Sequence, residues 1–345
     1  MTTSSASGKI ILFGEHAVVY GRPALAVPVT QVHADVEISA SSRPGIWNDA
    51  PGIGLRSDLN SLPSDHPIAA VIHNFLFLSR TSPSPARAER SDSGDEAGRG
   101  AGGEGIEINI TSTIPVASGL GSGAAVTVAL TRALSSHLNF PMTDEEVNAF
   151  AYEIEKLHHG TPSGIDNTVV TYAKPVYFVK GQPIETFTVG HPFTIVIGDT
   201  GISAPTRESV GDVRKLWEAD RSKWEGVFDE VGEIVKQAKQ AIESGKPALP
   251  KERRDDVSEA EGRRVLGSLM DQNHTLLQQM TVSSPELDKL VEAARNAGAL
   301  GAKLSGGGRG GNMIALVEKE NAPDVSEALL LAGAKSAIVT TITTS

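Results

Sequence analysis

Cysteine is absent from the 345-residue chain. Its absence excludes disulfide bonds, thiolate metal sites and cysteine nucleophiles. No apolar run approaches the roughly 18 to 20 residues that a membrane-spanning helix requires. Residues 1–9 also lack the basic region and the apolar block that together mark a signal peptide. We therefore expect a cytoplasmic protein as the default.

An excess of positive charge is also missing. The chain carries 31 Lys and Arg against 42 Asp and Glu, a formal net charge of −11. Nucleic acid is not an expected partner, because phosphate backbones are bound by basic surfaces. If the ligand is an anion, its positive partners must be local. This directs attention to lysines and arginines beside glycine-rich loops.

The length of the chain suits two domains better than one core. A Gly-His-Pro break precedes the apolar stretch 193–201, and a boundary there gives domains of residues 1–190 and 191–345. Residues 80–105 are rich in Ser, Gly, Arg and Glu and have almost no large apolar side chains, which predicts a disordered insertion. A second, charged loop is expected at 246–261.

Periodicity predicts the helices and strands around these segments. β-branched residues alternate at Val32, Val36 and Ile38, as in a half-buried strand. Thr143 and Glu146 have the spacing of a capping box at a helix start. Strands are expected at 9–13, 23–40, 106–110, 193–201 and 336–343. Helices are expected at 66–78, 123–138, 143–158, 206–244, 262–280, 285–297 and 323–332.

The stretch PVASGLGSGAAVTVAL (115–130) places three glycines and two serines where a helix begins. A strand, a glycine loop and a helix in this order let backbone N–H groups and the helix dipole hold an anion. It is not a P-loop, because Gly123 is followed by Ala124 and not by Lys. It is not a dinucleotide fingerprint either, because Asp144 and Glu145, at the required distance, fall in a helix cap.

Glycines that only permit tight packing are the alternative explanation for this loop. Two further loops, HGTPSGIDNT (159–168) and KLSGGGRGGNMIAL (303–316), are also rich in glycine or proline. Three such loops, each flanked by regular elements, are hard to explain by packing alone. We therefore expect at least one of them to bring the backbone close to a ligand.

Three charged residues are candidates for chemistry. Lys9 begins an apolar strand, where a lysine is usually a solvated edge charge, but it precedes the polar cluster of Glu15 and His16, which favours a functional role. Asp166 is either an Asx-turn residue or a free carboxylate, and the spacing leaves both open. Glu155 lies at the edge of an apolar helix stripe near the C-terminal end. It either pairs with a lysine or binds a cation, and the helix dipole favours a cation.

Two other features allow simpler explanations. His158 and His159 close a helix, where they suit the dipole, and no third ligand is spaced to complete a metal site. Arg309 interrupts the last glycine loop, where its guanidinium could contact a phosphate or lie in solvent.

Four segments, GKIILFGEHAVVYG, PVASGLGSGAAV, HGTPSGIDN and KLSGGGRGG, together resemble the GHMP small-molecule kinases. The similarity covers nearly the whole chain apart from 80–105 and 246–261. The first and third segments are specific and are similar to those of the branch that acts on mevalonate. Galactokinases and homoserine kinases carry different residues in the first segment. The middle glycine loop alone indicates only the superfamily.

The resemblance implies ATP-dependent phosphorylation of the C5 hydroxyl of mevalonate in isoprenoid synthesis. It also implies an α+β fold with an N-terminal domain like domain 2 of ribosomal protein S5, a C-terminal ferredoxin-like domain and the active site between them. The expected cofactors are ATP and Mg²⁺. The expected partner is the small-molecule substrate, with a homodimer left open and neither nucleic acid nor a membrane involved.

Carried over by position, the resemblance assigns roles to individual residues. Asp166 and Lys9 match the catalytic aspartate and lysine, and Glu155 matches the magnesium-binding glutamate. Residues on the acceptor side are Glu15, His16, Thr206 and Gly307. Residues of the ATP phosphate loop are Pro115, Ala117, Ser118, Gly119, Leu120, Gly121, Ser122, Gly123 and Ala124.

The chain departs from the family pattern at several positions. The family usually has two serines in the loop, the second a magnesium ligand, whereas this chain has Ser122 followed by Gly123. Either Ser122 or water takes the second position at the metal. Arg309 and Asn312 stand where small residues are usual, and Ser7 replaces a usual proline. Alternative functions are a phosphomevalonate kinase, a mevalonate 3-kinase or a non-catalytic ligand-binding member of the fold. Retention of a proton acceptor argues against the last.

Overall fold

The computed structural model describes residues 1–81, 105–115, 118–159, 162–183, 185–203, 206–244 and 259–343. Most of the insertion predicted at 80–105 and of the charged loop predicted at 246–261 lies outside these residues, as does Ala117. Within the described ranges, no helix has both the length and the apolar composition that a membrane span requires.

Two compact units make up the chain, and each is assembled from separate segments. The first holds residues 1–8, 32–115 and 121–172, and the second holds 9–31, 116–120 and 173–345. Strands β1 (Thr2–Phe13) and β2 (Ala24–Ser41) pair with each other and contribute residues to both units. A single domain boundary near residue 190 stays a prediction.

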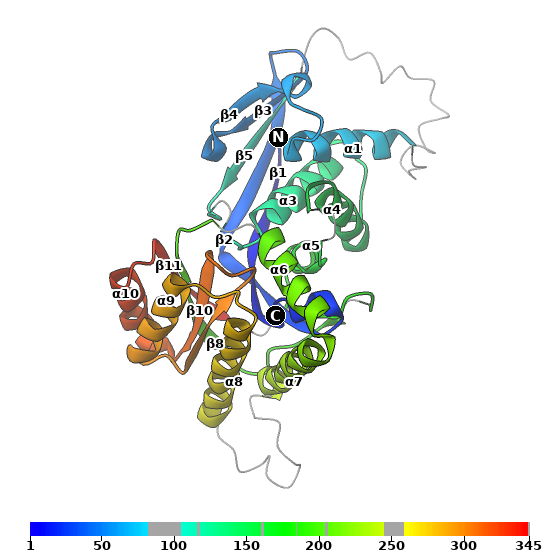
Figure 1. Ribbon diagram of the computed structural model, residues 1–345. Coiled ribbons are helices and arrows are strands. Elements are labelled where there is room, and N and C mark those ends of the chain that lie inside the picture. The colour runs from blue at the N-terminus through cyan, green and yellow to red at the C-terminus, as the bar shows by residue number, and fades with distance from the viewer. Residues whose placement is uncertain are drawn as a thin grey trace. The chain divides into compact units, whose positions relative to one another are not determined.

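In the first unit, helices pack beside a sheet (Figure 1). Its strands are β3 (Ile46–Ala50), β4 (Leu55–Asp58) and β5 (Gly105–Ser112), which with β2 follow the order β4-β3-β5-β2. Strand β5 is antiparallel to β2 and parallel to β3. The helices are α1 (Pro67–Thr81), α3 (Ser122–His137), α4 (Asp144–His159) and α5 (Ile165–Tyr172). Helices α3 and α4 each pack against the other three.

Local sequence signals account for much of this unit. The alternating residues Val32, Val36 and Ile38 of β2 are all buried, as a half-buried strand requires. The capping box at the start of α4 is confirmed: the Thr143 N–H donates to Glu146 Oε2 at 2.7 Å, and the Glu146 N–H donates to Thr143 Oγ1 at 3.3 Å.

The second unit is built on a four-stranded antiparallel sheet with the strand order β11-β8-β10-β9. Its strands are β8 (Phe193–Asp199), β9 (Gly301–Ser305), β10 (Asn312–Val317) and β11 (Ser336–Ile342). Helices α8 (Glu259–Gln279) and α9 (Pro285–Asn296) pack on β9, and α10 (Ala322–Leu331) packs on β8 (Figure 1). With helices between β8 and β9 and between β10 and β11, this is the expected ferredoxin-like arrangement. The α+β class is confirmed.

Smaller elements complete the second unit. The short strands β6 (Val176–Phe178) and β7 (Glu185–Thr186) extend the pairing of β2, with β6 bonded to residues 24–26. The turn of 3-10 helix η1 (Ala17–Tyr20) follows β1 and packs on the helix α7 (Arg221–Ser244).

The helix predicted at 206–244 is two helices, α6 (Thr206–Ala219) and α7 (Arg221–Ser244). Asp220 separates them, and its carboxylate accepts the Lys223 N–H at 3.1 Å. An aspartate that bonds a backbone N–H three residues later favours a new helix start. The apolar residues expected to face inward along 206–244 were Trp217, Trp224, Phe228, Val231 and Val235. All are buried except Trp217, which is half-buried. Helix α8 begins at Glu259, so the loop predicted at 246–261 extends too far.

Candidate active site

The acceptor-side residues predicted in the GEH segment lie on a tight turn where β1 ends. Gly14 has φ +96°, and a Cβ there would lie 2.4 Å from the Pro23 carbonyl oxygen. Only glycine therefore fits at this position. His16, two residues later, also adopts a positive φ of 60°. The turn directs both Glu15 and His16 inward, and they are 2% and 5% exposed.

Glu15 forms an ion pair with Lys303 of β9 inside the second unit. The two side chains are 1% and 0% exposed, and Lys303 also donates to the Leu304 carbonyl at 2.6 Å. Burial lowers the pKa of Lys303, while the Glu15 carboxylate opposes that shift. Glu15 Oε2 is buried and has no hydrogen-bond partner among the described residues. It is an acceptor without a donor.

His16 is a second buried acceptor beside the first. Its Nε2 lies 3.1 Å from the Gly307 carbonyl oxygen. A carbonyl can only accept, so Nε2 carries the proton and Nδ1 has a lone pair. Burial lowers the pKa of His16 to about 4, so the ring is neutral at pH 7. Nδ1 is buried and has no partner within the described part of the chain. Glu15 and His16 together therefore suit a ligand that donates hydrogen bonds, such as an alcohol.

Gly307 and Thr206 complete this cluster from two further segments. Thr206 is the first residue of α6, and a Cβ on Gly307 would lie 2.8 Å from Thr206 Oγ1 and 3.1 Å from its Cβ. The Thr206 side chain thus packs directly over Gly307, whose carbonyl bonds His16. The structure brings the four predicted acceptor-side residues together in the second unit.

Packing explains some of the glycines in the last loop. A Cβ on Gly308 would lie 1.9 Å from the Val282 carbonyl oxygen, and one on Gly310 would lie 2.4 Å from that of Ile202. These two glycines are needed for close backbone packing, so packing accounts for part of this loop. Gly306 differs, because a Cβ there meets no described atom within 4 Å.

Arg309 contacts a carboxylate, which neither sequence alternative anticipated. Its Nη1 donates to Asp212 Oδ2 of α6 at 2.6 Å, and its Nε donates to the Thr281 carbonyl at 3.2 Å. Hydrogen bonds from Lys215 and then from Arg309 lower the pKa of Asp212 to about 2. Arg309 therefore ties the last glycine loop to α6.

Of the predicted phosphate loop, the structure describes Pro115 and the residues from Ser118 onward. Gly119 and Gly121 have φ of 81° and 74°, and Gly121 is the N-cap of α3. A Cβ on Gly119 would have as its nearest described atom Asn312 Nδ2 at 3.8 Å, and one on Gly123 would meet no described atom within 4 Å. Packing therefore does not explain Gly119 or Gly123. Their backbone is open to a ligand.

Asp166 and Glu155 lie in the first unit and are both half-buried. Asp166 is in the first turn of α5, a helix that the sequence analysis missed. Its neighbours serve local structure: Asn167 Nδ2 donates to Asn148 Oδ1 at 2.6 Å, and Thr168 Oγ1 donates to the Gly164 carbonyl at 2.6 Å. Asp166 is therefore a helix residue and not part of a loop turn. Glu155 is on α4, which packs against both α3 and α5.

The described residues include no group of three His, Asp or Glu side chains that would hold a metal alone. Mg²⁺ does not need one, since it is usually bound by one or two carboxylates together with substrate phosphates and water. A single half-buried carboxylate at Glu155, with the Ser122 hydroxyl at the start of α3, fits that donor chemistry.

Two residues with candidate functional roles, Lys303 and Asn312, were not predicted from the sequence. Lys303 lies in the fully buried strand GAKLS, and an unpaired lysine in an apolar strand is a signal for a buried acidic partner. Asn312 was noted only as a departure from the family pattern. It is 1% exposed, and its Nδ2 donates to the Ser118 carbonyl in the phosphate loop.

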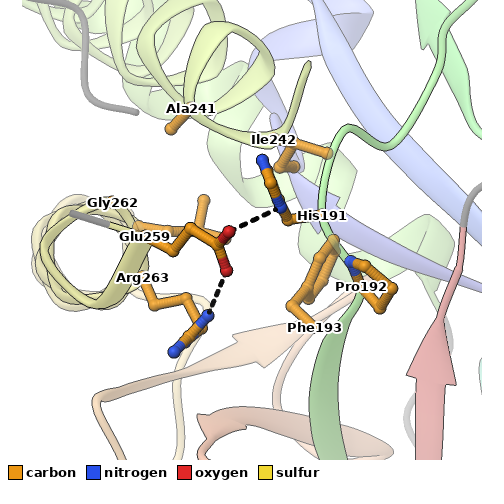
Figure 2. A pocket seen from close by; sticks show the side chains of 9 residues that line it. His191, Pro192, Phe193, Ala241, Ile242, Glu259, Gly262 and Arg263 are labelled. Atoms are coloured by element: carbon orange, nitrogen blue, oxygen red, sulfur yellow. Dashed lines mark ion pairs between the residues drawn. The ribbon is translucent and has the colours of Figure 1, made fainter. Parts of the chain in front are cut away.

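A separate small hollow lies where α7 ends and α8 begins (Figure 2). In it the Glu259 carboxylate is 3.1 Å from His191 Nδ1 and 3.8 Å from Arg263 Nη1. Figure 2 shows these three polar side chains beside Phe193. The described residues that line it are distinct from those predicted to bind ATP, metal or acceptor.

Comparison with known proteins supplies independent information. The family described as GHMP kinases N terminal domain matches residues 91–174, and GHMP kinases C terminal matches residues 259–335. Mevalonate kinase from Thermococcus gammatolerans is 36% identical over 342 residues, covering 96% of this chain and 93% of that protein. Mevalonate kinase from Pyrococcus abyssi is 35% identical over 339 residues with the same coverage. The crystal structure of L. major mevalonate kinase in complex with R-mevalonate has a TM-score of 0.78 and 29% identity, covering 100% of this chain and 97% of that one.

Proposed function

Because the chain belongs to the mevalonate kinase family of the GHMP kinases, we propose that it transfers the γ-phosphoryl group of ATP to the C5 hydroxyl of (R)-mevalonate. The observation that carries the proposal is a pair of buried acceptors, Glu15 Oε2 and His16 Nδ1, which have no partner among the described residues. Mevalonate has two hydroxyl groups, and a hydroxyl is the donor that such a pair lacks.

The residues that bind the acceptor substrate are assigned from these two hydrogen-bond acceptors. Glu15 and His16 accept hydrogen bonds from substrate hydroxyls, and Thr206 adds a hydroxyl beside Gly307. Because His16 stays neutral far below pH 7, its Nδ1 remains an acceptor throughout the physiological range. Lys303 pairs with Glu15 Oε1, which leaves Glu15 Oε2 to accept a hydrogen bond from the substrate.

The nucleotide side uses backbone donors. The phosphates of ATP accept hydrogen bonds from N–H groups in residues 119–124, where α3 begins and its dipole favours negative charge. Because Gly119 and Gly123 leave the backbone uncovered, phosphate oxygens reach these N–H groups without displacing side chains.

In the transfer step Asp166 accepts or orients the proton of the C5 hydroxyl. The acceptor oxygen forms a bond to the γ-phosphorus, the bond to the bridging oxygen breaks, and ADP leaves. Lys9 stabilises the negative charge that develops on the acceptor oxygen. Glu155 and Ser122 would hold Mg²⁺, which would supply positive charge to the β- and γ-phosphates.

An ADP-release assay across alternative acceptors tests the proposal. We expect turnover with mevalonate and none with phosphomevalonate, galactose or homoserine. Activity with another acceptor in place of mevalonate would overturn the substrate assignment, and no ADP release with any acceptor would favour a non-catalytic member of the fold. The position of the new phosphate on the product, read by phosphorus NMR, separates C5 transfer from a mevalonate 3-kinase.

Two substitutions test the assigned residues. Asp166→Asn is expected to preserve ATP binding and to abolish turnover, so unchanged turnover would remove Asp166 from the mechanism. Glu155→Gln is expected to raise the Mg²⁺ concentration needed for half-maximal activity. Glu153→Gln is a matched control on the same helix, because Glu153 is exposed and pairs with Lys156. An equal shift in both variants would contradict the metal role of Glu155.

A further inference from the structure

Asn312 is a polar residue that is almost completely buried at the start of a strand. It begins β10, directly opposite Ser305 of β9, and is 1% exposed. Its Nδ2 donates to the Ser118 carbonyl oxygen. The orientation of the amide is set by this contact, since the amide oxygen could not bond a carbonyl. Its Oδ1 is buried and has no partner among the described residues. The bond to Ser118 is therefore the one side-chain hydrogen bond of Asn312 within the described residues.

The contact holds one end of a short segment whose other end is held separately. The Lys9 N–H of β1 donates to the Leu120 carbonyl at 2.9 Å. Residues 118–120 are thus fixed at two carbonyls, one on each side of Gly119. All of these contacts lie within the second unit.

Fixing a carbonyl also fixes the N–H of the next residue. The two groups belong to one planar trans peptide, in which the C=O and the N–H point in opposite directions. With the Ser118 carbonyl directed at Asn312, the Gly119 N–H points away from β10. With the Leu120 carbonyl directed at β1, the Gly121 N–H points away from β1. Neither N–H donates a hydrogen bond within the described part of the chain.

We propose that Asn312 is a positioning residue for ATP, which acts through the Ser118 carbonyl to aim the Gly119 N–H at a phosphate oxygen. The inference rests on the proposed function, because it assumes that this loop binds phosphate. A side chain as small as alanine or serine at this position could not reach the carbonyl. In this chain the loop is therefore held in its binding orientation before ATP arrives, and less ordering is required on binding.

The residue that precedes Asn312 in the last glycine loop is also held by hydrogen bonds. The carbonyl of Gly311, next to Asn312, accepts hydrogen bonds from both the N–H and the Oγ1 of Thr200, each at 2.9 Å. Asn312 is therefore itself held in place by the backbone that leads toward α6. A rigid anchor is a requirement for a positioning residue.

Variants of the full chain separate this role from a general packing role. Asn312→Ala removes the donor, and Asn312→Ser introduces a small polar residue that cannot reach Ser118. Ser305→Ala is the matched control, because Ser305 lies opposite Asn312, is also buried, and bonds the backbone of β1 at the Ile11 carbonyl at 2.8 Å. The readouts are the Kd for ATP by calorimetry, the KM values for ATP and mevalonate, and the melting temperature.

We expect both Asn312 variants to raise the Kd and KM for ATP roughly three- to tenfold, the fold-change for one typical hydrogen bond. The KM for mevalonate should stay within about twofold, and Ser305→Ala should leave the Kd for ATP unchanged. Folded Asn312 variants that bind ATP as tightly as the wild type would overturn the proposal. So would an equal loss of ATP affinity in Ser305→Ala.

The same data distinguish failure of this inference from failure of the proposed function. A wild-type chain that does not bind ATP overturns both. A wild-type chain that binds ATP but phosphorylates a different acceptor overturns the substrate assignment, while the Kd ratio between wild type and Asn312→Ala still decides the role of Asn312.

Discussion

Lys303 and Glu15 form an ion pair that is shielded from water, with side chains 0% and 1% exposed, although they are 288 residues apart in the chain. The pair joins the buried strand β9 to the turn that follows β1. Next to it, His16 bonds the carbonyl of Gly307 at 3.1 Å. Two neighbouring residues of one turn are therefore held by two points of the segment 303–307.

Replacing Lys303 alone should destabilise the protein strongly. Lys303→Met leaves the Glu15 carboxylate buried without its cation, a change that typically costs about 3 to 5 kcal/mol. The double variant Lys303→Met with Glu15→Gln removes both charges and should recover part of that loss. Urea denaturation of the wild type, both single variants and the double variant measures the coupling. Strictly additive losses would show that the two side chains do not stabilise each other.

The free energy of unfolding should fall as the pH is lowered from 6.5 to 4, because His274 is buried in its neutral form. Burial lowers the pKa of His274 to about 4, despite the opposing Asp288 carboxylate at 3.1 Å. In the unfolded chain the pKa is near 6.5. The unfolded state therefore takes up a proton first as the pH falls. The stabilisation is complete above pH 6.5 and is lost toward pH 4, by about 3 kcal/mol in total.

The variant His274→Gln isolates this contribution. It cannot be protonated, so its free energy of unfolding should fall less steeply than that of the wild type over the same pH interval. Chemical denaturation at several pH values gives both slopes. Parallel curves for the two proteins would contradict the assignment of the pH dependence to His274.

Gly307→Ala should lower kcat/KM for mevalonate without a comparable change in the KM for ATP. The new Cβ would lie 2.8 Å from Thr206 Oγ1, so Thr206 and the start of α6 must shift. A displacement of about 1 Å in a site can cost about a hundredfold in rate, and we expect kcat/KM for mevalonate to fall at least tenfold. Gly211→Ala is the control, because a Cβ there meets no described atom within 4 Å. Steady-state kinetics with full activity in Gly307→Ala would rule out this packing argument.

The capping box of α4 should contribute measurably to stability. Thr143→Ala removes the side-chain acceptor of the Glu146 N–H and is expected to cost about 1 kcal/mol. Thr143→Ser keeps the hydroxyl and should cost much less. Thermal and urea denaturation measure both. If Ala and Ser are equally destabilising, the lost methyl group and not the cap is responsible.

Several individual strands and helices of this protein could be predicted from short sequence patterns. Alternation in β2 and the Thr143 and Glu146 spacing are short-range signals, and the structure contains both features where they were predicted. The break of the predicted helix 206–244 at Asp220 and the helix α5 were missed, because a single capping residue and a short helix leave weak periodic signals. Strands β9 and β10 were missed because glycines surround them.

The candidate site also contains both residues that the sequence predicts and contacts that it does not predict. The residue types in the GEH segment and the glycine loops were visible in the sequence, because turn geometry and close backbone approach restrict which residues are tolerated locally. The partner of Glu15, the carboxylate that Arg309 binds and the carbonyl that Asn312 holds were not visible. Each of these contacts joins segments distant in the chain, and only the packing of one folded unit brings such segments within hydrogen-bonding distance.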